Sequence, residues 1–251
     1  MGNEQAALRG SVVHLRTVVN GLRPDQVRQS AYPTGWTIAD TLSHLGAGAA
    51  IMVRTLEDIV HGRDTDPEFN QSVWDEWNAK DPDAKAADAL TVDQALVDRI
   101  DDLDDAQRSA FRYEMGPLSV DLAGFVGLRL NEHVVHTWDV EVTVDPTAVL
   151  PPDAAGVIID RLGLIVGFAG RPIGSERTVH VTTSGPDRGI TMALGVDAVE
   201  MALCAPVDEP DLELPTEAFI RLVYGRLDPD HTPPSVKGGA LDELRQAFPG
   251  I

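Results

Sequence analysis

The N-terminal part of the chain repeats its apolar residues with the period of an α-helix. Apolar positions recur at three- and four-residue steps in four long stretches, which predicts amphipathic helices over residues 4–22, 37–61, 84–103 and 118–144. A shorter helix is expected over residues 68–80. Four long helices in sequence are typical of a helix bundle, where side chains on facing helices can build a metal site in the interior.

The pattern changes after a proline-containing linker, Asp145-Pro146 to Pro151-Pro152. The predicted elements beyond it are helices over residues 153–168, 215–227 and 241–248, and strands over residues 178–183, 190–194, 199–204 and 235–238. This mixture predicts an α+β module. We therefore expect two domains, a helix bundle over residues 1–148 and a smaller α+β domain over residues 149–251. Residues 109–117 are expected to form a loop.

Composition narrows the choice of partners. The chain has 40 acidic and 20 basic residues and a net charge of −20, which argues against nucleic acid and anionic membranes as partners. Residues 1–10 lack the apolar run of a signal segment, and no stretch has the roughly 18 apolar residues that a membrane span needs. A single cysteine, Cys204, excludes an intrachain disulfide and suits the cytoplasm; its apolar surroundings predict an inert buried thiol.

The helix over residues 118–144 carries the most informative motif of the chain. Glu132 and His136 are four residues apart, so a helix places both side chains on one face, one turn apart. A carboxylate and an imidazole in this arrangement supply two ligands of a three-ligand metal site. The third ligand must come from elsewhere, and His44 on the helix over residues 37–61 is the best candidate. Three ligands would leave the metal open for chemistry.

Neighbouring residues of the motif have less certain roles. His133 lies about 100° around the helix from Glu132, so we assign it to the surface or to a supporting position behind the ligands. Asp139 follows His136 by three residues and either orients an imidazole or caps the helix. Asp40, three residues after a threonine at an N-cap position and one turn before His44, either forms part of a capping box or orients an imidazole.

Three motifs together resemble a known family. They are Gly35-Trp36-Thr37 with His44-Leu45, then Glu132 and His136 with Trp138-Asp139, then Leu214-Pro215 with Glu217-Ala218, Arg221-Leu222 and Gly225-Arg226-Leu227. By these residues the chain resembles the mycothiol-dependent maleylpyruvate isomerase family. The resemblance implies a DinB-like four-helix bundle followed by a smaller sterol-carrier-like α+β domain. It also implies that His44, Glu132 and His136 bind a divalent metal, with zinc expected, and that mycothiol is the thiol cosubstrate.

This resemblance implies a metal-activated thiol as the reactive group. A thiol bound to Zn²⁺ loses its proton near neutral pH, because the metal stabilises the thiolate. The thiolate can add to a cis-enedioate such as maleylpyruvate, and the resulting single bond rotates before the thiolate leaves. An enzyme that keeps the adduct would instead be a thiol S-transferase acting on other electrophiles. The remaining alternative is a non-catalytic module that binds a metal or ligand.

Four further residues are candidates for substrate or cofactor contacts. Arg221 and Arg226 are candidate catalytic residues, because the planar guanidinium binds the carboxylates expected on the electrophilic substrate. The alternative for both is a structural or surface role. Trp36 is a candidate for the thiol pocket, with core packing as its alternative. Arg129, one turn before Glu132, either reaches the cleft that binds the cofactor or pairs with that carboxylate.

Overall fold

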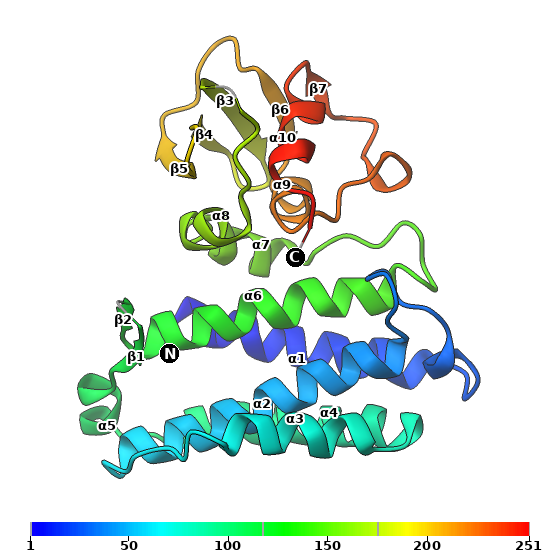
Figure 1. Cartoon of the computed structure of the whole chain (residues 1–251), viewed down its shortest axis with the longest axis vertical. Coiled ribbons are helices and arrows are strands. Elements are labelled where there is room, and N and C mark those ends of the chain that lie inside the picture. Colours follow the sequence, from blue (N-terminus) through cyan, green and yellow to red (C-terminus); the bar gives the residue numbers. More distant parts are fainter. Residues whose placement is uncertain (1, 117, 175, 251) are drawn as a thin grey trace. The chain divides into compact units, whose positions relative to one another are not determined.

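A computed structural model describes residues 2–116, 118–174 and 176–250 of the chain. It divides into two compact units, Met1–Ala148 and Val149–Ile251, each of which is described by itself. The predicted fold class, a helix bundle followed by a smaller α+β part, is confirmed (Figure 1). None of the described helices is long and apolar enough to cross a membrane.

The first unit is built from long antiparallel helices. Its elements are α1 (Asn3–Gly21), η1 (Gln26–Arg28), α2 (Ile38–Val60), α3 (Phe69–Ala79), α4 (Pro82–Asp101), α5 (Asp105–Ala110), β1 (Tyr113–Met115), β2 (Leu118–Val120) and α6 (Leu122–Glu141). Helix α1 packs against α4 and α6, α2 packs against α4 and α6, and α3 lies along α2. The four long helices predicted from the sequence therefore form the bundle.

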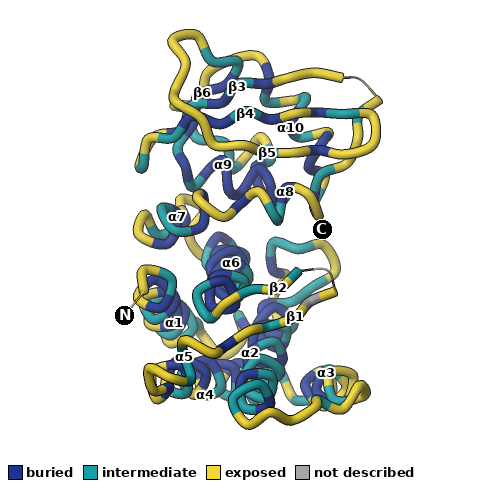
Figure 2. The backbone as a smooth tube through the Cα atoms, turned by 90° about the vertical axis from the view of Figure 1, so that its left-hand side faces the viewer, coloured by how far each residue is buried: buried dark blue, intermediate teal, exposed yellow. Residues whose placement is uncertain are grey.

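The helices of the bundle carry buried residues along part of their length, and Figure 2 shows these in dark blue. One cluster of buried residues joins α1, α2, α3, α4 and α6 and consists of Leu15, Val27, Ala31, Ile38, Leu42, Leu45, Ala47, Val73, Trp77, Ala86, Ala89, Leu90 and Val140. Most residues of α6 are buried as well. Along each long helix these residues recur at three- and four-residue steps, and this is the spacing from which the helices were predicted.

The predicted loop over residues 109–117 is wrong in part. Residues 105–110 form the short helix α5, which begins with a capping box between Asp104 and Gln107. Strands β1 and β2 then pair as an antiparallel hairpin, with Tyr113 opposite Val120. Helix α6 consequently starts at Leu122 rather than at residue 118, after Asp121 accepts a hydrogen bond from the backbone of Gly124.

The second unit is a five-stranded sheet with helices. Its elements are α7 (Pro152–Ile159), α8 (Gly163–Ala169), β3 (Arg177–Ser184), β4 (Arg188–Leu194), β5 (Val199–Cys204), β6 (Leu212–Pro215), α9 (Thr216–Val223), η2 (Pro229–His231), β7 (Lys237–Gly238) and α10 (Leu241–Ala247). The strand order is β5-β4-β3-β6-β7, and only the β3–β6 pair is parallel. Alternate residues of β3, including Val179 and Val181, are buried, and α9 packs against β3 and β6.

Three sequence predictions for this unit need correction. The single helix expected over residues 153–168 is two helices, α7 and α8, separated by a turn around Arg161. Strand β6 was not predicted: no element was expected over residues 212–214, and Pro215 was expected to begin the following helix. Cys204 is exposed rather than buried, because β5 is an edge strand and its last residues lie outside the core.

Close packing between α2 and α3 generates the first prediction. A Cβ at Gly46 would lie 2.1 Å from the ring of Trp77, which is 3% exposed. We expect Gly46→Ala to lower the free energy of unfolding by roughly 1–2 kcal/mol, because overpacking outweighs the gain in helix propensity. Urea denaturation measures the change. Gly10→Ala is the matched control: that helical position has no atom within 4 Å, so its variant should be as stable as the wild type or more so. Equal effects of the two substitutions would contradict the packing argument.

A histidine between α1 and α6 generates the second prediction. His14 Nε2 lies 2.7 Å from Glu141 Oε2, and this hydrogen bond raises the pKa of His14 above its usual 6.5 although burial opposes the shift. A raised folded-state pKa means that protonation favours the folded state, so the contribution is present at acidic pH and lost as pH rises through the raised pKa. The free energy of unfolding should therefore fall in His14→Gln below about pH 6 and match the wild type above about pH 9. A loss of the same size at both pH values would contradict this assignment.

Candidate metal centre

Contacts at the N-terminus of α2 determine the direction in which His44 points into the bundle. Thr37 Oγ1 accepts a hydrogen bond from the backbone N–H of Asp40 at 3.1 Å, and Asp40 Oδ2 accepts one from the backbone N–H of Thr37 at 3.1 Å. This reciprocal pair is a full capping box, as the sequence indicated for Asp40. Lys85 of α4 also donates to Asp40 at 2.9 Å, which ties the first turn of α2 to α4. His44 follows in the second turn of a helix whose start is therefore well determined.

The structure brings the three predicted ligands together. Glu132 Oε2 lies 3.3 Å from His44 Nε2 and 3.5 Å from His136 Nε2. One donor atom of each residue lies within 4.8 Å of the other two. Glu132 and His136 reach this position from adjacent turns of α6, while His44 approaches from α2.

These distances suit a divalent metal. Two ligand atoms that are each ~2.1 Å from a tetrahedral metal lie ~3.4 Å apart, which is the spacing from Glu132 to each histidine. Two imidazole nitrogens and a carboxylate oxygen are a common donor set for zinc and related ions. The Glu132 side chain is 45% exposed and the His44 side chain is 31% exposed, so the group is accessible to solvent.

Asp139 orients one of the histidines. Its Oδ2 lies 2.8 Å from His136 Nδ1, and its side chain is fully buried. A carboxylate at this position accepts the Nδ1–H, so the lone pair of Nε2 is directed toward Glu132 and His44. Of the two sequence alternatives for Asp139, the orientation of an imidazole is therefore confirmed.

The charges of the site stabilise one another. Burial alone would raise the pKa of Glu132, but hydrogen bonds and charge interactions with His136 and His44 hold it far below its usual value. Burial lowers the pKa of His136, yet Asp139 and Glu132 together raise it above the usual 6.5. Glu132 is therefore an anion throughout the physiological range, as a carboxylate must be to bind a metal.

Aromatic rings flank the histidines. The ring centroid of Trp36 lies 5.4 Å from that of His44 and 6.0 Å from that of His136, with the second pair stacked. Trp74 of α3 stacks on His44 at 5.4 Å. The sequence identified Trp36 as a candidate pocket residue but gave Trp74 no role, because the helical pattern of α3 shows only that Trp74 lies near the core. The close approach of α3 to α2 is what brings the Trp74 ring to the site.

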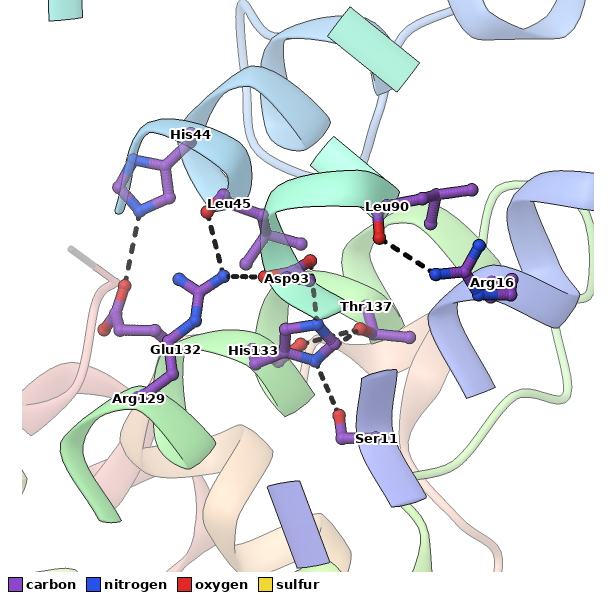
Figure 3. Close-up of polar contacts among 10 residues, drawn as sticks. All are labelled: Ser11, Arg16, His44, Leu45, Leu90, Asp93, Arg129, Glu132, His133 and Thr137. Atoms are coloured by element: carbon purple, nitrogen blue, oxygen red, sulfur yellow. Dashed lines mark hydrogen bonds and ion pairs between the residues drawn. The ribbon is translucent and has the colours of Figure 1, made fainter. Parts of the chain in front are cut away.

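Arg129 and His133 have partners that the sequence did not indicate. Arg129 pairs with Asp93 of α4 rather than with Glu132, and its Nη2 donates to the backbone oxygen of Leu45 at 2.8 Å. His133 is completely buried, which corrects the surface alternative, and its ring nitrogens contact Asp93 and Ser11 (Figure 3). Burial lowers the pKa of His133, although Asp93 opposes this shift. His133 is therefore a neutral imidazole behind the three predicted ligands.

The two arginines of the second unit are both buried. Arg221 of α9 donates to Glu217 from Nε at 2.7 Å and from Nη2 at 2.9 Å, and its Nη1 donates to the backbone oxygens of Arg226 and His231. Arg226 donates from Nη1 to the backbone oxygen of Tyr224 at 2.7 Å. These contacts favour the structural alternative that the sequence left open. A substrate contact by either arginine stays a prediction.

Residues 8–141 match the mycothiol maleylpyruvate isomerase N-terminal domain family. Two crystal structures of mycothiol-dependent maleylpyruvate isomerase, one of them a histidine-to-alanine variant, resemble the chain with a TM-score of 0.65 and 14% sequence identity over 90% of both chains. At that identity the structural likeness establishes the fold alone. No functionally curated protein sequence was found to match. The family match covers more than half of the chain, and the chain therefore belongs to the mycothiol maleylpyruvate isomerase N-terminal domain family.

Proposed function

We propose that this protein is a metal-dependent enzyme that uses a low-molecular-weight thiol as cosubstrate. The convergence of His44, Glu132 and His136, with spacing that suits one divalent ion, is the observation that carries the proposal. Family membership supports it, and the two crystal structures described above are named mycothiol-dependent. Mycothiol is accordingly the thiol that we propose, and the reducing cytoplasm is the compartment that would keep it in the thiol form.

We propose zinc as the metal, because this donor set is common for zinc, as it is for related divalent ions. Two neutral imidazoles and one carboxylate leave at least one coordination position for a ligand that the protein does not supply. When bound, the metal would lower the pKa of a thiol at that position and so supply a thiolate nucleophile at neutral pH. The protein's own part is to hold the donors in place, chiefly through the Asp139 hydrogen bond to His136.

Neighbouring side chains define what can approach the open position. Trp36 and Trp74 contact the histidine rings and shield their faces from water, and we propose that Trp36 also contacts the bound thiol. The electrophile would be an activated alkene that bears carboxylates, as maleylpyruvate does. Thiolate addition turns its double bond into a single bond, which rotates before the thiolate is expelled and the trans alkene forms.

Arginines are the natural partners of such carboxylates, but the three candidates differ. The guanidinium of Arg129 uses Nη2 for Asp93 and Leu45, and Arg129 is proposed to contact the cofactor. Arg221 and Arg226 are proposed to contact the substrate, yet both already make hydrogen bonds within the second unit. The proposed function therefore depends on the metal site and does not depend on these arginines.

Metal binding generates the third prediction. The wild-type protein should bind about one equivalent of Zn²⁺ per chain, and His44→Ala or Glu132→Ala should weaken binding on the order of 100-fold or more, because each removes a direct ligand. Metal analysis after dialysis and calorimetric titration measure this. His61→Ala is the matched control, since His61 follows α2 and is half exposed, outside the group of three ligands. Equal metal binding by wild type and His44→Ala would disprove the assigned site.

Thiol chemistry generates the fourth prediction. Metal-loaded protein incubated with mycothiol and maleylpyruvate should convert the cis alkene to the trans isomer, followed by absorbance and mass spectrometry. The His44→Ala variant should lose this activity while retaining its helical circular dichroism. Accumulation of a stable thioether would identify an S-transferase, which still supports a thiol-dependent enzyme. If the metal-loaded protein neither isomerises the alkene nor forms a thioether with this or other electrophiles, the protein is a non-catalytic module.

A further inference from the structure

A buried polar network lies next to the metal ligands. It consists of Asp93 on α4, Arg129 and His133 on α6, and Ser11 on α1 (Figure 3). Each of these four residues is at least 95% buried, with exposures of 1%, 3%, 0% and 4% respectively. Burying an ion pair away from water costs free energy that packed apolar side chains would avoid, so stability alone is a weak reason for this arrangement.

Asp93 is the centre of the network. Its Oδ1 accepts a hydrogen bond from Arg129 Nη2, and its Oδ2 lies 3.2 Å from His133 Nε2. His133 Nδ1 in turn lies 2.7 Å from Ser11 Oγ. Because the two oxygens of one carboxylate bind residues on successive turns of α6, Asp93 fixes both the rotation and the axial position of that helix relative to α4.

The same network reaches the helix that carries His44. Arg129 Nη2 also donates to the backbone oxygen of Leu45, the residue that follows His44. Gly48 lies one turn after His44, and a Cβ added there would lie 3.0 Å from Arg129 Nη1. The guanidinium of Arg129 therefore fills the space between α2 and α6 directly beside the metal ligands, and the absence of a side chain at Gly48 makes that space.

The network residues and the ligands on α6 lie close together in the sequence of one helix, so their orientations are linked. Arg129 lies three residues before Glu132, and His133 lies between Glu132 and His136. On a helix, fixing residues 129 and 133 fixes the direction in which residues 132 and 136 point. Any shift of α6 against α2 by part of a turn would separate Glu132 from His44, which approach within 3.3 Å from different helices.

We propose that Asp93 is a positioning residue for the metal site. By binding Arg129 and His133, it holds the two ligands of α6 in register with the ligand of α2, so that the three donors are preorganised before a metal arrives. This role rests on the proposed metal-dependent function. Asp93 itself is not a member of the ligand group formed by His44, Glu132 and His136.

The test compares two buried carboxylates in the full-length protein loaded with Co²⁺, whose visible spectrum reports coordination geometry. Asp93→Asn should weaken Co²⁺ binding by about 10- to 100-fold, the usual effect of losing a supporting contact, and should change the spectrum of the bound ion. The matched control is Asp58→Asn. Asp58 is on α2, is 1% exposed and binds Arg54, Arg63 and Thr65, so its variant should lose stability while keeping the Co²⁺ affinity and spectrum of the wild type.

A second variant keeps the test decisive if Asp93→Asn does not fold. Asp93→Asn with Arg129→Gln removes both charges of the buried pair and leaves no unpaired ion, so the chain should fold. It also lacks the long guanidinium that separates α2 from α6. We expect this double variant to recover stability without recovering Co²⁺ affinity. Wild-type affinity and spectrum in either folded Asp93 variant would overturn the positioning role.

Co²⁺ binding by the wild type and by His44→Ala is measured in parallel. These two measurements distinguish a failure of the positioning role from a failure of the proposed metal site. If the wild type binds Co²⁺ and His44→Ala does not, the metal site is correct and the Asp93 variants alone decide the positioning role. If the wild type binds no Co²⁺, the proposed function fails first, and the positioning role fails with it.

Discussion

The packing of α4 against α6 depends on the buried carboxylate of Asp93. A charged group without water must be surrounded by donors, and Arg129 and His133 of α6 are those donors. Burial would raise the pKa of Asp93, but the neighbouring positive charge of Arg129 and the hydrogen bonds hold it below its usual value. In the observed register of α4 and α6 the Asp93 carboxylate binds both Arg129 and His133, and Glu132 and His136 face His44 on α2.

The side chains around the candidate site fall into two groups: those that hold the histidines in place and those that are accessible to solvent. The carboxylate of Asp139 and the rings of Trp36 and Trp74 engage the histidines from the sides, whereas the Glu132 carboxylate remains partly exposed. A metal held by side chains from two rigid helices, with an open coordination position, is suited to binding a small exogenous ligand. The family to which the chain belongs gives that ligand a proposed identity, a thiol.

Local signals explain what the sequence could predict. Glu132 and His136 share a helical face by their spacing, and a capping box at Thr37 and Asp40 marks the start of α2, so the two ligand-bearing helices were predictable. The partner of Arg129 was not, because Asp93 is 36 positions away on another helix and nothing local marks it. Strand β6 and the hairpin of β1 and β2 were missed because such short strands depend on tertiary pairing. The prediction of a buried Cys204 was wrong because the sequence pattern does not show that β5 lies at the edge of its sheet.

X-ray absorption spectroscopy of the zinc-loaded protein tests the central claim most directly. A Cys204→Ser background removes the only cysteine of the chain, so any thiolate bound to the metal must come from an added thiol. The spectrum should show nitrogen and oxygen ligands at ~2.0–2.1 Å, including two imidazoles, and a sulfur ligand at ~2.3 Å after mycothiol is added. Four protein ligands with no change on addition of the thiol would contradict an open, thiol-binding metal site at His44, Glu132 and His136.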